Sequence, residues 1–214
     1  MQGWRKRMED AHVTDLNLGP SRQTQIFGVF DGHGGCEVAK FVSNHFVQEF
    51  LSNPNYNKND IKKALEENYL KMDKLMLEKE GSEELLNEYK KSKEEADKIK
   101  ENNKNAQIEM LRQVIDPKEQ PDAKISMFTG CTANVLVIHD NKLFFANAGD
   151  SRSILCKKGQ AYPMSTDHKP SIPSELKRIE KADGWVSDGR ILGNLNISRG
   201  IGDSEYKMDK RLNI

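Results

Sequence analysis

Apolar residues recur at helical spacing in two stretches of the first half of the chain. From residue 36 to 51 they form one stripe, and Pro54 follows, which predicts an amphipathic helix that ends before the proline. The stripe contains Val38, Phe41, Val42, His45, Phe46 and Phe50. We expect its histidine to be packed rather than to bind a metal, because no partner with ligand spacing lies nearby. Residues 60–79 predict a second helix, with Asp60 as N-cap and Gly81 as C-terminal stop.

Short apolar runs separated by turn signals fill much of the remaining chain. Residues 24–30 are almost continuously apolar, so we predict a strand that is buried on both faces. Residues 128–138 predict a core strand, and residues 142–148 predict its return strand across an Asp-Asn turn. A short helix is predicted at 173–181. Two strands are predicted at 153–156 and 161–164, with Lys158-Gly159 as their turn, and a second hairpin is predicted at 185–191 around Asp188-Gly189.

The order of these elements predicts the fold class. Strands come in meanders followed by helices instead of alternating with them as in a parallel sheet, so we predict an α+β fold with two antiparallel sheets and helices outside. A chain of 214 residues is long enough for one substantial domain. We therefore expect residues 1–214 to form a single domain.

Residues 82–124 differ in composition from the rest of the chain. Lys, Glu, Asp and Asn dominate up to Asn105, and many Glu/Lys pairs lie three or four residues apart, which predicts a charged, solvated helical insertion. One interpretation is an excursion without a specific role, since residues 82–105 offer little apolar surface to anchor them and could then be deleted without loss of activity. The other is a helix within 82–115 that binds a protein partner or regulates the protein.

The overall composition excludes several classes of partner. Lys and Arg number 33 together, as do Asp and Glu, so the balanced charge gives no reason to expect nucleic acid or a membrane surface as partner. No apolar run reaches the length of a membrane span, and we expect no signal peptide. The three cysteines lack Cys-x-x-Cys spacing, which favours a reducing compartment. We expect a monomeric protein of the cytoplasm or nucleus.

Candidate chemistry is concentrated in the sequence Asp31-Gly32-His33-Gly34-Gly35, which directly follows the predicted strand at 24–30. An aspartate supplies the hard oxygens that Mg²⁺ and Mn²⁺ prefer. A glycine leaves its own carbonyl accessible, since no Cβ blocks the approach. A histidine exchanges protons near neutral pH. Asp-Gly alone is an ordinary turn signal, so the significance of this stretch depends on partners elsewhere in the chain.

Four further polar blocks accompany this stretch: Gly3-Trp4-Arg5, Met8-Glu9-Asp10-Ala11-His12, Gly149-Asp150-Ser151-Arg152 and Ser198-Arg199-Gly200-Ile201-Gly202-Asp203. With them, the chain resembles the metal-dependent protein serine/threonine phosphatases of type 2C, from Gln2 to about Lys207. The resemblance implies a four-layer α-β-β-α sandwich with metal ions in a cleft at one end. It also implies hydrolysis of phosphoserine and phosphothreonine in protein substrates by a metal-activated water.

The resemblance assigns the metal-binding residues. Two Mg²⁺ or Mn²⁺ ions are expected in a complete domain, with Asp31 bridging them and Gly32 offering its carbonyl oxygen. Glu9 and Asp10 would hold metal-bound waters or bind directly, because such cations keep several waters. Asp150 resembles a position that takes part in a weaker third metal site.

The remaining assignments concern the substrate and the loops. The planar guanidinium of Arg5 suits bidentate phosphate binding, and His33 is the candidate for protonating the departing seryl or threonyl oxygen. Arg199 and Asp203 match a structural motif and are expected to hold loops. Each residue also has a plainer interpretation, such as Arg5 and Glu9 belonging to a wet, mixed-charge surface.

The family pattern continues after Asp203 with an Asp-Gly-x-x-Asp turn and an Asp-Asn pair that complete a metal site, and these do not follow in this chain. We therefore expect the sandwich to be incomplete at its C-terminus and the chain alone to be a poor catalyst. The alternative to a phosphatase is a catalytically inactive or truncated protein of the same fold that binds or regulates others.

Overall fold

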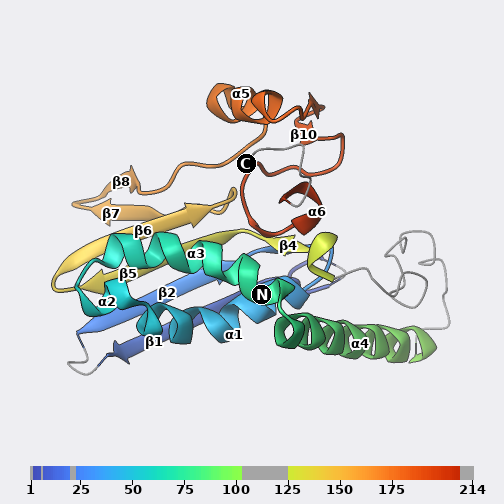
Figure 1. Ribbon diagram of the computed structural model, residues 1–214, viewed down its shortest axis with the longest axis horizontal. Helices are drawn as coiled ribbons and strands as arrows, with labels where there is room; N and C mark the ends of the chain where they lie inside the picture. Colours follow the sequence, from blue (N-terminus) through green and yellow to red (C-terminus); the bar gives the residue numbers. More distant parts are fainter. Residues whose placement is uncertain (1, 6, 20–22, 103–124, 208–214) are drawn as a thin grey trace.

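The computed structural model describes residues 2–5, 7–19, 23–102 and 125–207. Its largest sheet is antiparallel and has the strand order β1 (Ala11–Leu18), β2 (Thr24–Phe30), β5 (Ala133–His139) and β6 (Lys142–Ala148). Helices α1 (Glu37–Ser52) and α3 (Ile61–Leu77) cover one face of this sheet, and the short α2 (Pro54–Asn57) connects them (Figure 1). The main core lies between this face and the two long helices.

The helix predictions from apolar spacing are confirmed. Phe46 and Phe50 of the α1 stripe are fully buried. His45 is packed as expected, with its ring 4.3 Å from that of Phe41. Asp60 caps α3, since its Oδ1 accepts the backbone N–H of Lys63 at 3.1 Å.

The prediction that strand 24–30 is buried on both faces is wrong. Ile26 and Phe30 are fully buried, but Val29 is 52% exposed. The side chains of β2 alternate between two faces, and α1 and α3 cover only one of them. Both faces of β2 carry apolar side chains, but only the face that the helices cover is fully buried.

Strand 128–138 was predicted as one element, but the structure interrupts it at Thr132 and gives β4 (Gly130–Cys131) and β5. The turn to β6 is as predicted. Asp140 and Asn141 have φ values of 48° and 59°, the left-handed pair that matches the twist of a two-residue hairpin.

A small sheet joins segments that lie far apart in the sequence. Its strand order is β11 (Ile201–Gly202), β4 and β3 (Gly32–His33), all antiparallel. Cys131 lies in its middle strand and is fully buried, and this burial raises the pKa of its thiol well above the usual range. The sheet brings the segment after β2 next to the segment near residue 201.

Smaller elements lie beyond the β6 edge of the large sheet (Figure 1). Helix α5 matches its predicted boundaries, and the predicted hairpins are present. These elements are β7 (Ile154–Lys157), β8 (Gln160–Pro163), α5 (Pro173–Lys181), β9 (Val186–Ser187), β10 (Arg190–Ile191) and α6 (Ser204–Lys207).

Gly81 does not end a helix, contrary to expectation. Helix α3 ends at Leu77, and α4 (Lys79–Asn102) begins two residues later with Gly81 inside it. A Cβ on Gly81 would lie 2.1 Å from the carbonyl oxygen of Leu75. The glycine is needed because α4 begins against the last turn of α3, not because it stops a helix.

Helix α4 is anchored to the core, which corrects the interpretation of this segment as a solvated excursion. Leu85 is 1% exposed. Glu84 Oε2 lies 2.7 Å from His45 Nε2, and Lys40 Nζ donates to Glu88 Oε1 at 2.5 Å. Deletion of residues 82–105 would remove these contacts with α1, so we now expect it to destabilise the fold. The part of the insertion from 103 to 124 lies outside the described residues.

The expected α+β class with antiparallel sheets and flanking helices is confirmed. Outside the large sheet, the described strands form smaller sheets of two or three strands. Within the described ranges, none of the helices has the length and apolar character needed to cross a membrane.

Candidate active site

Asp31 lies at the point where β2 ends and the small sheet begins. Its backbone N–H donates to Thr132 Oγ1 at 3.2 Å, and its carbonyl accepts the N–H of Thr132 at 2.9 Å. Thr132 Oγ1 also lies 2.7 Å from Ser151 Oγ. The interruption between β4 and β5 at Thr132 therefore fixes the backbone of Asp31 and connects it to the segment that carries Asp150.

Gly32 permits a close approach of the N-terminal segment. A Cβ at this position would lie 2.2 Å from the carbonyl oxygen of Glu9 and 3.0 Å from that of Gly35. Any side chain here would push the two segments apart. The glycine thereby lets Glu9 and Asp10 lie beside Asp31.

The carboxylates of this region influence one another. Burial raises the pKa of Asp31 above its usual value, and the negative charges of Asp10 and Asp150 raise it further. A hydrogen bond with the Asp10 side chain acts in the same direction. Burial likewise raises the pKa of Glu9, against the lowering effect of Arg5 and Arg7. Several acidic groups from separate segments thus converge on one place.

These residues surround a small polar cavity of about 180 Å³. Its lining consists of Gln2, Arg5, Arg7, Met8, Glu9, Asp10, Asp31 and Gly32. Arg5 is exposed, so its guanidinium is free to meet a group that enters from solvent. The cavity combines hard oxygen donors with a planar cation, which suits a phosphate and a divalent ion.

Asp150 is held at the end of β6 by polar side chains. Asn147 Nδ2 donates to the carbonyl of Gly149 at 3.1 Å, and Asn134 Nδ2 donates to that of Ser151 at 3.2 Å. Asp150 Oδ2 itself pairs with Lys169 Nζ. Asp150 does not line the small cavity, but its charge acts on Asp31.

His33 is paired with Asp203 across the small sheet. Its Nε2 lies 2.8 Å from Asp203 Oδ1 and 2.9 Å from Oδ2. Burial opposes protonation of His33, but the hydrogen bond and charge of Asp203, with Asp31 and Glu9, raise its pKa overall. Gly130 leaves room for the pair, since a Cβ there would lie 2.3 Å from Asp203 Oδ2 and 2.7 Å from His33 Nε2.

Arg199 lies apart from the carboxylate group and holds α5. Its Nε and Nη2 donate to the two carboxylate oxygens of Glu175 at 3.0 and 2.8 Å, and Arg178 Nη2 donates to Glu175 at 3.0 Å. Burial alone would raise the pKa of Glu175, but the hydrogen bonds from Arg199 and Arg178 lower it to about 2. This fits the loop-holding role expected for Arg199.

The structure brings together most residues that the sequence singled out. Arg5, Glu9, Asp10, Asp31 and Gly32 share one cavity. Among the described residues, however, no three His, Cys, Asp or Glu side chains are arranged closely enough to form a metal-binding cluster.

Sequence reasoning missed the supporting residues Thr132 and Lys169, the contact of Ser151 with Thr132, and the contact of Asp203 with His33. A threonine in a strand break carries no distinctive pattern. The block that contains Asp203 was found, but its partner lies 170 residues away, beyond any local signal.

The family model described as protein phosphatase 2C matches residues 1–88 and 79–213. The chain is 46% identical over 214 residues to "Probable protein phosphatase 2C 2" and 47% identical over 212 residues to "Protein phosphatase 2C 1", both from Paramecium tetraurelia. These alignments cover 100% and 99% of this chain but 60% of each relative.

The fold comparison agrees with the sequence comparison. A crystal structure of serine-threonine phosphatase 2C from Toxoplasma gondii superposes with a TM-score of 0.64 at 18% identity, covering 98% of this chain and 67% of that one. At this identity, the match supports the fold alone.

Proposed function

Because this chain belongs to the protein phosphatase 2C family, we propose that the protein carrying it is a metal-dependent protein serine/threonine phosphatase. The observation that carries the proposal is the small polar cavity that Glu9, Asp10 and Asp31 line together with the exposed Arg5. The substrates we propose are phosphoserine and phosphothreonine side chains of other proteins.

The donor set fits a hard divalent cation. Asp10 and Asp31 place two carboxylates beside each other, and burial disfavours the charge of Asp31, so a cation would relieve this cost. Gly32 offers a backbone carbonyl at a position that tolerates no side chain. Few protein ligands suffice for Mg²⁺ or Mn²⁺, because such ions keep several waters. When bound, the metal supplies charge neutralisation and a water of lowered pKa.

Arg5 and His33 act on the substrate in this proposal. The guanidinium of Arg5 binds two phosphoryl oxygens through its fork of N–H donors. His33 gives a proton to the departing seryl or threonyl oxygen. Asp203 occupies Nε2 of His33, so Nδ1 is the nitrogen left to exchange a proton with the substrate.

A second candidate function is a binding or regulatory protein of the same fold without turnover. It is favoured by the lack of a three-residue metal cluster among residues 2–5, 7–19, 23–102 and 125–207. The chain spans 60% of the length of the curated relatives that it matches.

The proposal is tested by phosphate release from a phosphoserine peptide with the complete gene product, with and without Mn²⁺. We expect release that needs the metal and that is lost in Asp31→Asn. Asp188→Asn is the matched control, because Asp188 lies in an exposed turn of the β9–β10 hairpin. Metal-dependent binding of a phosphopeptide without phosphate release would support the second candidate instead.

A further inference from the structure

The turn that presents Asp203 to His33 has a strained backbone. Asp203 has a φ of 50° and Gly202 a φ of 84°, and the left-handed region is unfavourable for a residue with a side chain. The backbone N–H of Asp203 donates to the carbonyl of Thr129 at 2.9 Å. Residues held in this way persist only where surrounding contacts fix them. The structure must therefore contain contacts that hold this turn.

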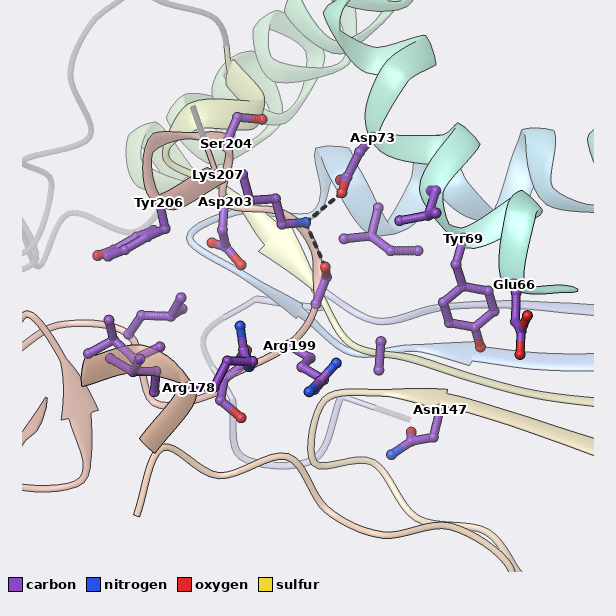
Figure 2. A pocket seen from close by; sticks show the side chains of 18 of the residues that line it. Glu66, Tyr69, Asp73, Asn147, Arg178, Arg199, Asp203, Ser204, Tyr206 and Lys207 are labelled. Atoms are coloured by element: carbon purple, nitrogen blue, oxygen red, sulfur yellow. Dashed lines mark hydrogen bonds and ion pairs between the residues drawn. The ribbon is translucent and has the colours of Figure 1, made fainter. Parts of the chain in front are cut away.

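One carboxylate on α3 supplies several of these contacts (Figure 2). Asp73 Oδ1 accepts the backbone N–H of Gly202 at 2.8 Å, and its Oδ2 lies 2.6 Å from Lys207 Nζ. Lys207 Nζ also donates to the carbonyl of Gly200 at 2.7 Å. Asp73 and Lys207 thus hold the turn on both sides of Ile201, within the wall of a groove of about 1600 Å³.

We propose that Asp73 is a positioning residue for the reaction, acting together with Lys207 on the turn that carries Asp203 and through Asp203 on His33. The inference rests on the proposed function, because it concerns the group assigned to protonate the leaving oxygen. The observation that carries it is a continuous path: Asp73 bonds to the Gly202 N–H, Gly202 is followed by Asp203, and Asp203 bonds to His33.

The tight packing at Gly130 makes this path sensitive to small movements. A Cβ on Gly130 would overlap both Asp203 Oδ2 and His33 Nε2, so the pair lies directly on the backbone of β4. Gly202 also packs closely against the neighbouring backbone, since a Cβ there would lie 2.5 Å from the carbonyl oxygen of Thr129. If Asp73 releases the Gly202 N–H, Asp203 shifts and the hydrogen bond that orients His33 lengthens. A displaced acid loses much of its effect.

The first experiment compares two substrates in the complete gene product. Proton donation matters most for a poor leaving group. Asp73→Ala should lower kcat for a phosphoserine peptide about tenfold more than kcat for nitrophenyl phosphate, with little change in KM. Asp73→Asn keeps an acceptor for the Gly202 N–H and should restore most of the peptide activity. Equal losses for both substrates would overturn the inference.

Glu66→Ala is the matched control. Glu66 is another carboxylate on α3 in the wall of the same groove, and its Oε1 lies 3.9 Å from Lys62 Nζ at the surface. We expect no change in the ratio of the two activities. A shift as large as that of Asp73→Ala would show that any change to α3 has this effect and would count against Asp73.

A double-mutant cycle tests the route through His33. In a His33→Gln background, Asp73→Ala should cause no further loss that is selective for the peptide, because the group it positions is gone. Independent, additive losses would show that Asp73 acts elsewhere and would overturn the inference.

A structural measurement separates this inference from the proposed function. Amide hydrogen exchange at Gly202 and the ring nitrogen signals of His33 need no turnover. Asp73→Ala should speed exchange at Gly202 and shift the His33 signals, and Asp73→Asn should do so less. If the wild-type protein releases no phosphate, the proposed function fails, and these signals still decide the positioning role.

If Asp73→Ala does not fold, Lys207→Met takes its place and should cause the same changes more weakly. Unchanged signals in a folded variant would contradict the inference.

Discussion

Two regions of the molecule hold carboxylates in opposite electrostatic surroundings. Around Asp31, acidic groups lie beside each other, and burial with mutual repulsion raises the pKa of Asp31. At Glu175, two arginines meet one buried carboxylate, and its pKa falls to about 2. The charge at Glu175 is already compensated within the fold, so this region serves stability. The charge of Asp31 itself is not compensated in this way, because burial and its acidic neighbours oppose it. This region therefore costs stability, and a cation would relieve that cost.

The largest expected effect concerns turnover at the uncompensated region. Asp31→Asn should lower phosphate release about a thousandfold or more, equivalent to ~4 kcal/mol of transition-state stabilisation. The fold should keep or slightly gain stability, because a destabilised negative charge is removed. Phosphate release and urea unfolding of the complete gene product measure both quantities. Near-normal turnover would show that Asp31 is not a ligand.

The next largest effect concerns the compensated region. Glu175→Gln leaves Arg178 and Arg199 without their shared carboxylate, so the free energy of unfolding should fall by about 3 kcal/mol at pH 7. Urea unfolding measures the loss, and Glu180→Gln on the exposed side of the same helix is the control. If the two variants are equally stable, the arginine pairs contribute nothing measurable.

The two regions should also differ in the sign of their pH dependence. The pKa of Glu175 is lowered on folding, so its stabilisation is present above pH ~4.5 and is lost as the pH falls towards ~2, by about 2 kcal/mol. The pKa of Asp31 is raised on folding, so its contribution is favourable at low pH and is lost as the pH rises through the raised pKa. Unfolding free energies of wild type, Glu175→Gln and Asp31→Asn across pH should reveal opposite slopes. If the stability difference from wild type changes with pH in the same direction for both variants, the two regions do not differ electrostatically as described.

The smallest effect concerns the cation at the edge of the uncompensated region. Arg5 is exposed and is assigned to the substrate phosphate, so Arg5→Ala should raise KM about tenfold, as expected for losing a charged hydrogen bond. The value of kcat should change less. Steady-state kinetics measures the two separately, and a loss confined to kcat would assign Arg5 to the transition state instead.

The parts of the fold that sequence predicted well depend on local signals. The boundaries of α5 and the Asp140-Asn141 turn follow from residues that lie next to each other. The errors involve contacts over distance. Gly81 looked like a stop, but its role depends on Leu75 of the preceding helix, and the exposure of Val29 depends on which face the helices cover.

The same division applies to the site. Its acidic residues were found because they sit in dense polar blocks. Asp73 is an ordinary acidic residue on a helix, and nothing near it in the sequence indicates that it bonds to a residue 129 positions away.

The burial of Cys131 provides a way to measure how often the small sheet beside the site opens. Its thiol lies in the middle strand of the sheet that joins His33 to Gly202, and a buried, protonated thiol does not react with alkylating reagents. Cys156 on β7 is exposed and can react in the closed molecule. The slow modification of Cys131, set against the rapid modification of Cys156, would therefore report how often this small sheet separates while the rest of the protein stays folded.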